Sequence, residues 1–122
     1  MGSSLTITGP VERDGVSIIQ VSGRLDAEGA VTFREYCGGY RAVNDKPLLI
    51  DLAGVTFVAS SGVGTLLVLT DAFSEAGKEI AFYNLSEVVD QVVDFLNLQE
   101  FLCLASSLEE ALILVHHAPD TA

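Results

Sequence analysis

Apolar and polar residues alternate near the start of the chain, which is the pattern expected of β-strands. Residues 5–8 alternate, and residues 16–21 are rich in Val and Ile and lie between two glycines. Pro10 and the pair Asp14-Gly15 separate these segments and predict a turn. Together the two segments predict a β-hairpin at the beginning of the fold.

The segment after this hairpin has the spacing of a helix. Apolar residues recur three or four positions apart from Ala30 to Tyr40, which predicts a helix over residues 27–43. Asp26 stands in the position of an N-cap, whose side chain accepts a hydrogen bond from a free N–H of the first turn. Each glycine inside the segment disfavours the helix by about 1 kcal/mol, so we expect tertiary contacts to hold it.

A continuous apolar run that begins with a proline, residues 47–52, predicts a strand buried on both faces. After this strand we expect a loop and then a second helix, which opens at Ser60 and ends at Gly77. Residues 66–69 are all apolar, which predicts that this helix is packed deep in the molecule.

The remaining strands and the third helix are shorter. Residues 80–83 predict one strand and residues 101–104 predict the last one. Between them, Ser86 is the expected cap of a helix that extends through Leu96. Its valines and Leu96 form one face and its acidic residues the other, so we expect the apolar face to pack on the sheet.

The last predicted helix follows two overlapping Ser-x-x-Glu capping boxes, which begin at Ser106 and Ser107. It spans residues 108–116, and we expect the tail from Ala118 to fray.

The predicted order of elements is β-β-α-β-α-β-α-β-α. Strands that alternate with helices after a leading hairpin indicate an α/β fold, with a mixed sheet of about five strands and about four helices. We expect a single domain over residues 1–122, with its core at about 5–116.

Composition and charge narrow the class of protein. Of the 122 residues, 49% are apolar and 19% are charged, which is typical of a globular domain. Six basic and 17 acidic residues give a net charge of −11, which disfavours nucleic acids and anionic membranes as partners. The sequence has no secretion signal and no apolar run of membrane-spanning length, so we expect a cytoplasmic protein. Cys37 and Cys103 are then expected to be buried thiols and not a disulfide.

The motifs disfavour three kinds of catalytic or cofactor site. Adjacent His116 and His117 point in different directions on a helix, and no CxxC or HExxH is present, so we expect no metal. The Gly-x-Gly at Gly62 lacks a third glycine and a P-loop lysine, so we expect no nucleotide cofactor. Ser60 follows a buried strand, but the GxSxG motif of a hydrolase is absent and the histidines are far away. We therefore expect no enzymatic activity.

Ser60 and Ser61 have two interpretations. A serine at a helix start caps a free backbone N–H, and one serine is sufficient for that. The other hydroxyl is then free at the positive end of the helix, where an anion is favoured. Phosphorylation there would add about −1.5 to −2 charges at the surface without unfolding the domain. From these residues alone, capping and phosphorylation both stay open.

The segment DLAGVTFVASSGVG, residues 51–64, resembles the signature of the STAS domain family, which includes bacterial anti-sigma factor antagonists. That signature is an acid-leucine strand end, a small loop, and Asp-Ser-Ser-Gly at the start of a helix. Residues 23–26, Gly-Arg-Leu-Asp, are similar to the family's segment after the second strand, and residues 107–111 to its closing helix. The resemblance covers residues 5–115 and implies the STAS fold.

The resemblance also implies a partner-switching function. An anti-sigma factor antagonist binds an anti-sigma factor that is also a serine kinase, and the kinase phosphorylates the first serine, here Ser60. The phosphorylated form is released, and a serine phosphatase resets it. Ser61 would cap the helix and shape the loop, and Asp26 matches an acidic position near the phosphorylated loop. Together with Gly54 and Gly62, these residues are the expected partner-binding motif.

The chain departs from the family pattern at Ala59, where the family carries the acid before the two serines. This departure motivates an alternative function, a STAS scaffold module that is not phosphorylated and belongs to a larger signalling or transport assembly. For such an assembly, Leu52, Val55 and Val58 are expected to offer exposed apolar surface.

Overall fold

The computed structural model describes residues 4–116, which form the predicted order of elements with one added turn. The elements are β1 (Leu5–Arg13), β2 (Val16–Leu25), α1 (Ala27–Val43), β3 (Leu48–Val58), α2 (Ser60–Glu75), β4 (Ile80–Tyr83), α3 (Glu87–Phe95), a 3₁₀ turn η1 (Leu98–Glu100), β5 (Leu104–Ala105) and α4 (Leu108–His116). The predicted frayed tail lies outside the described residues.

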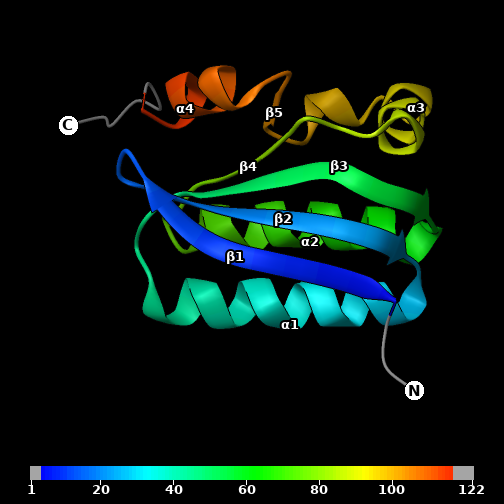
Figure 1. Ribbon diagram of the computed structural model, residues 1–122, viewed down its shortest axis with the longest axis horizontal. Helices are drawn as coiled ribbons and strands as arrows, with labels where there is room; N and C mark the ends of the chain where they lie inside the picture. Colours follow the sequence, from blue (N-terminus) through cyan, green and yellow to red (C-terminus); the bar gives the residue numbers. More distant parts are fainter. Residues whose placement is uncertain (1–3, 117–122) are drawn as a thin grey trace.

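The strands form one mixed sheet between two layers of helices. Its order is β1-β2-β3-β4-β5, with β1 antiparallel to β2 and every other pair parallel. Helices α1 and α2 cover one face of the sheet, and α3 and α4 lie over the other (Figure 1). The prediction of an α/β fold with a mixed five-stranded sheet and four helices is confirmed.

The first half of β3 is the centre of the core. Leu48, Leu49, Ile50 and Leu52 are fully buried, because helices cover the sheet on both sides of this strand. Ile50 belongs to the larger core cluster, and Leu49 to a second cluster on the side of α4. The prediction of a strand buried on both faces is therefore confirmed.

Three strands are longer than predicted. β2, expected over residues 16–21, continues to Leu25, and β1 and β3 also extend beyond their predicted ends. Pro10 lies inside β1 and not in a turn, because the register between β1 and β2 shifts from Thr8 to Val11. A proline is tolerated at such an irregularity of an edge strand, since it has no N–H to offer the ladder. The prediction of a loop directly after residue 52 is also wrong. β3 continues to Val58, since its second half pairs with residues 22–25 of β2 after a further register shift.

Three predictions about helices and the last strand are also corrected. Val68 of α2 is 53% exposed, because only one side of this helix faces the sheet and α1. Leu96 is likewise 47% exposed, just beyond the end of α3. The strand expected over residues 101–104 is reduced to Leu104–Ala105, since η1 and a turn occupy the preceding residues. Within residues 4–116, no helix is long and apolar enough to cross a bilayer.

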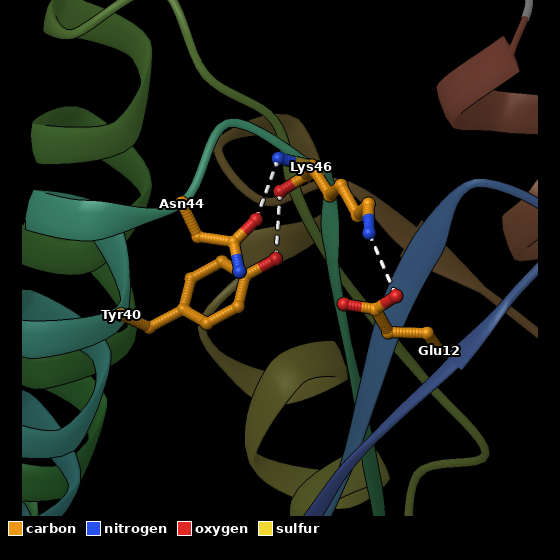
Figure 2. A network of polar contacts seen from close by, with 4 residues as sticks. All are labelled: Glu12, Tyr40, Asn44 and Lys46. Carbon is orange, nitrogen blue, oxygen red and sulfur yellow. Dashed lines mark hydrogen bonds and ion pairs between the residues drawn. The ribbon is translucent and has the colours of Figure 1, made fainter.

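Helix α1 has the predicted bounds and the predicted buried face. Its last turn is tied to the sheet by a polar network (Figure 2). The Tyr40 hydroxyl donates to the Lys46 carbonyl at 2.9 Å, and the Lys46 N–H donates to Asn44 Oδ1 at 3.0 Å. The Lys46 ammonium reaches Glu12 of β1 at 2.7 Å. This network therefore joins the end of α1 to β1 through the loop that leads into β3.

We expect the Tyr40→Phe variant to lose about 0.5–1.5 kcal/mol of unfolding free energy, because a part-buried carbonyl loses its donor. For Glu12→Gln the loss of unfolding free energy should be below about 0.5 kcal/mol, because the ion pair between Glu12 and Lys46 is exposed. Urea unfolding of both variants measures the difference. An equal effect of the two substitutions would contradict this ranking.

Candidate functional site

The predicted site residues meet at the carboxyl ends of β2 and β3. These strands are parallel, and Leu25 pairs with Val58 at the last position of each. Asp26 follows β2 directly, while Ser60 opens α2 one residue after Ala59. The structure thus brings the Asp26 and Ser60 segments to the same edge of the sheet. Ser60 and Ser61 are both exposed there.

Neither serine caps α2. The N-cap is Ala59, which has no side-chain oxygen, and the backbone N–H groups of Gly62 and Val63 both turn back to its carbonyl. The expectation that Ser61 caps the helix is therefore wrong, because the helix begins at Ser60, two residues before the start that a Ser61 cap would require. Ala59 is held by its own N–H, which donates to the Leu25 carbonyl at 3.0 Å. The hydroxyl of Ser60 consequently has no capping role.

Two glycines allow close packing around this edge. A Cβ added to Gly62 would lie 2.6 Å from the Leu25 carbonyl oxygen and 2.7 Å from its Cγ. One added to Gly54 would lie 2.6 Å from the Ser22 Cβ. Gly54 therefore lets β3 approach β2, and Gly62 lets the first turn of α2 lie against the end of β2.

Asp26 has a structural role in the same edge. Its carboxylate caps α1 by accepting the Gly29 N–H at 2.9 Å, and it lies 3.5 Å from the Arg24 guanidinium. The hydrogen bond from the Gly29 N–H has the largest effect and lowers the pKa of Asp26; burial opposes it, and Arg24 lowers the pKa further. Asp26 is therefore a carboxylate at neutral pH. The prediction that it caps the first helix is confirmed.

Arg24 and Phe57 are neighbours that sequence analysis did not assign to the site. The Arg24 guanidinium carbon lies 4.0 Å from the centre of the Phe57 ring, a cation–π contact between paired residues of β2 and β3. The pairing depends on the second half of β3, which was expected to be a loop. No sequence signal could place these two side chains together without that register.

A surface groove lies beside the serines. It has a volume of about 430 Å³ and is enclosed by the start of α2 on one side and the end of α3 on the other. Its walls are mostly apolar; the lining residues are Val58, Ala59, Ser60, Val63, Gln91, Val92, Phe95 and Leu96. Sequence analysis did not predict this groove; the adjacent apolar residues Phe95 and Leu96 at the end of the third helix are the local signal that could have indicated it. By contrast, Leu52 and Val55 are buried, so the expectation that they offer exposed surface is wrong.

Other reactive groups lie away from this groove. Cys37 is a buried thiol of α1, and its burial raises its pKa to about 12, so it is protonated at neutral pH. Cys103 is also a free thiol, as predicted, but it is only partly buried, so the expectation of burial is wrong for this residue. Among the described side chains, residues 4–115, no group of His, Cys, Asp and Glu could hold a metal ion. His117 lies outside the described residues.

The fold and the site together define a small α/β module with an exposed serine at the rim of an apolar groove. The family model of the STAS domain matches residues 10–111. The chain belongs to the STAS domain family, as its motif around Ser60 indicated.

Individual relatives are similar along nearly the whole chain. The anti-sigma-F factor antagonist RsfB of Mycobacterium tuberculosis is 28% identical over 111 residues, which cover 89% of this chain and 88% of RsfB. An anti-sigma factor antagonist from Mycobacterium paratuberculosis has the same fold, with a TM-score of 0.80 at 24% identity, over 95% of this chain and 99% of that one. The Bacillus protein SpoIIAA is similar in its unphosphorylated form, with a TM-score of 0.68 at 20% identity and coverages of 93% and 96%. Its phosphorylated form has a TM-score of 0.64 at 19% identity, with coverages of 91% and 98%.

We expect Gly62→Ala to destabilise the protein by about 1–3 kcal/mol, because its methyl group would overlap the backbone and side chain of Leu25. Gly64→Ala is the matched control in the same helix. No atom lies within 4 Å of its added Cβ, so we expect a gain of about 0.5–1 kcal/mol from helix propensity. Urea unfolding tests both, and a loss of stability in Gly64→Ala similar to that in Gly62→Ala would contradict this packing.

We expect the stability contributed by Asp26 to depend on pH. Because its pKa lies below the ordinary value of 3.8, the contribution is present above that pH and is lost as the pH falls through the folded pKa. Asp26→Ala should lower the urea midpoint at pH 7, and the difference from wild type should shrink on acidification below 3.8. Asp26→Asn should have a smaller effect at pH 7, since an amide oxygen still accepts from Gly29. A pH-independent deficit in Asp26→Ala would be inconsistent with this linkage.

Proposed function

We propose that the protein is an anti-sigma factor antagonist, a binding protein that is switched by phosphorylation of Ser60 and not an enzyme. The observation that carries this proposal is the position of Ser60. It is exposed on the first turn of α2, at the rim of an apolar groove, in a STAS domain whose relatives include named anti-sigma factor antagonists. The partner is an anti-sigma factor that acts as a serine kinase in the cytoplasm, and a serine phosphatase reverses the modification.

The local structure supports Ser60 over Ser61 as the acceptor. Ser60 lines the groove, so a kinase domain that binds there meets its hydroxyl. Both serines precede Gly62, which packs against Leu25 and leaves no space for a bulky group on the inner side of the first turn.

The fold is compatible with a phosphate at this position. The first turn of α2 has no side-chain cap, so its free N–H groups and the helix dipole favour an anion there. A phosphoserine carries about −1.5 to −2 charges, which would change the partner-facing surface without displacing a buried group. Phosphorylation therefore acts on binding, while the domain stays folded.

The absence of an acid at Ala59 supports the second candidate, an unphosphorylated STAS scaffold in a larger signalling or transport assembly. Ala59 contributes only backbone contacts, to Leu25 on one side and to the first turn of α2 on the other. Its methyl group offers neither a cap nor a carboxylate beside the Ser60 hydroxyl. The two candidates differ in one measurable property, the transfer of phosphate to Ser60.

The test incubates the full chain and ATP with each purified anti-sigma factor kinase of the source organism. We expect the cognate kinase to transfer a single phosphate to Ser60. Peptide mass spectrometry locates the phosphate, and calorimetry measures binding. Ser60→Ala should bind without being modified, Ser60→Asp should bind about tenfold or more weakly, and Ser61→Ala is the neighbouring control.

The two candidates then separate clearly. Equal affinity of Ser60→Ala and Ser60→Asp for the cognate factor would reject the switch. A stable complex that ATP leaves unchanged would favour the scaffold.

A further inference from the structure

The groove beside Ser60 continues into an exposed apolar surface at the end of α3. Phe95 is 88% exposed and Leu96 is 47% exposed, and both line the groove. The start of α2 and helix α3 lie at the same end of the molecule, where β3 ends (Figure 1). A large aromatic side chain with so little cover is typical of a residue that anchors a protein partner.

Charge is distributed unevenly along the chain. Residues 47–122 contain one basic residue, Lys78, and eleven acidic ones, while residues 1–46 contain five basic and six acidic residues. Helix α3 carries Glu87 and Asp90 in its first turn. Glu87 lies one helical turn before Gln91, which lines the groove, so it stands on the same face of α3. Glu87 is thus an exposed acid beside the apolar groove, whereas Asp90 and Asp94 line a separate hollow.

From these two observations we infer that the groove between α2 and α3 receives an apolar side chain of the anti-sigma factor, flanked by lysine or arginine, with Phe95 and Leu96 as its main contacts. This inference rests on the proposed function and adds the chemistry of the partner's docking segment. The apolar side chain fills the groove, and a flanking basic group faces Glu87 of α3. The negative charge of Glu87 orients the partner and accelerates its association.

The same groove explains how a phosphate on Ser60 releases the partner. Ser60 belongs to the wall of the groove, so its phosphate adds a dianion beside the apolar contact. Seating an apolar side chain there would remove water from that charge, which is strongly unfavourable. The modification thus disrupts binding at the groove itself.

The test compares two exposed phenylalanines near the end of α3. Phe95→Ser removes the anchor, and Phe101→Ser is the control, since Phe101 is 63% exposed and is not among the residues that line the groove. We expect Phe95→Ser to bind the cognate anti-sigma factor about tenfold or more weakly, and Phe101→Ser to stay within about twofold of wild type. Urea unfolding should give the wild-type midpoint for both variants, because neither side chain is buried.

A second comparison tests the charge of the partner. Glu87→Gln removes the acid beside the groove, and Glu109→Gln removes an exposed acid from the equivalent first turn of α4. We expect Glu87→Gln to lower the association rate about threefold at low salt. At high salt its association rate should approach that of wild type. Glu109→Gln should change the association rate less.

The outcomes distinguish this inference from the proposed function. If wild type binds and Ser60→Asp does not, but Phe95→Ser binds like wild type, the groove is not the docking site and the proposed function stands. Equal rates for Glu87→Gln and Glu109→Gln would reject a basic partner segment at α3. If wild type binds none of the anti-sigma factors, the proposed function fails and this inference fails with it.

Discussion

The parallel pairing of β2 with β3 continues to the last residue of each strand, and the functional edge of the molecule depends on it. Leu25 is the common contact, because its carbonyl accepts the Ala59 N–H and its side chain packs against Gly62. The same residue immediately precedes Asp26, the cap of α1. One strand end therefore sets where two helices begin. Ser60 is exposed at a defined place because its neighbours on both sides are held by this pairing.

Helix α2 differs from the other three helices in how its first turn is capped. Side-chain oxygens cap three of them: Asp26 for α1, Ser86 for α3 and Ser107 for α4. Helix α2 instead begins at Ala59, without such a cap. Because a side-chain cap typically contributes about 1 kcal/mol, the start of α2 gives up local stability. What holds it is the hydrogen bond and the packing against Leu25, and the free N–H groups of its first turn remain available to an anion.

Local signals in the sequence predicted most of the fold and part of the site. The helix over 27–43 and the strand over 80–83 have the expected bounds, because spacing, caps and apolar runs are local properties. The extension of β3 to Val58 was missed, since it follows from pairing with a distant strand after a change of register. The same cause hid the contact of Arg24 with Phe57. Helical periodicity suggested that both serines were at a helix start, but only the backbone geometry could assign the cap to Ala59.

The distribution of charge connects the site to the remainder of the chain. Of the basic side chains, Lys46 and Lys78 both lie at the opposite end of β3 from Ser60; Lys46 pairs with Glu12 and Lys78 contacts the Arg41 carbonyl and Asp45. Helix α3, beside the groove, contains no basic residue. A phosphate on Ser60 would therefore lie beside an apolar groove and far from both lysines, with Arg24 paired to Asp26 at the neighbouring strand end. In the proposed switch, a change of charge at this surface would then alter binding without a rearrangement of the sheet or its helices. An exposed Ser60 hydroxyl beside an apolar groove is thus consistent with the proposed switch, which would act through surface chemistry.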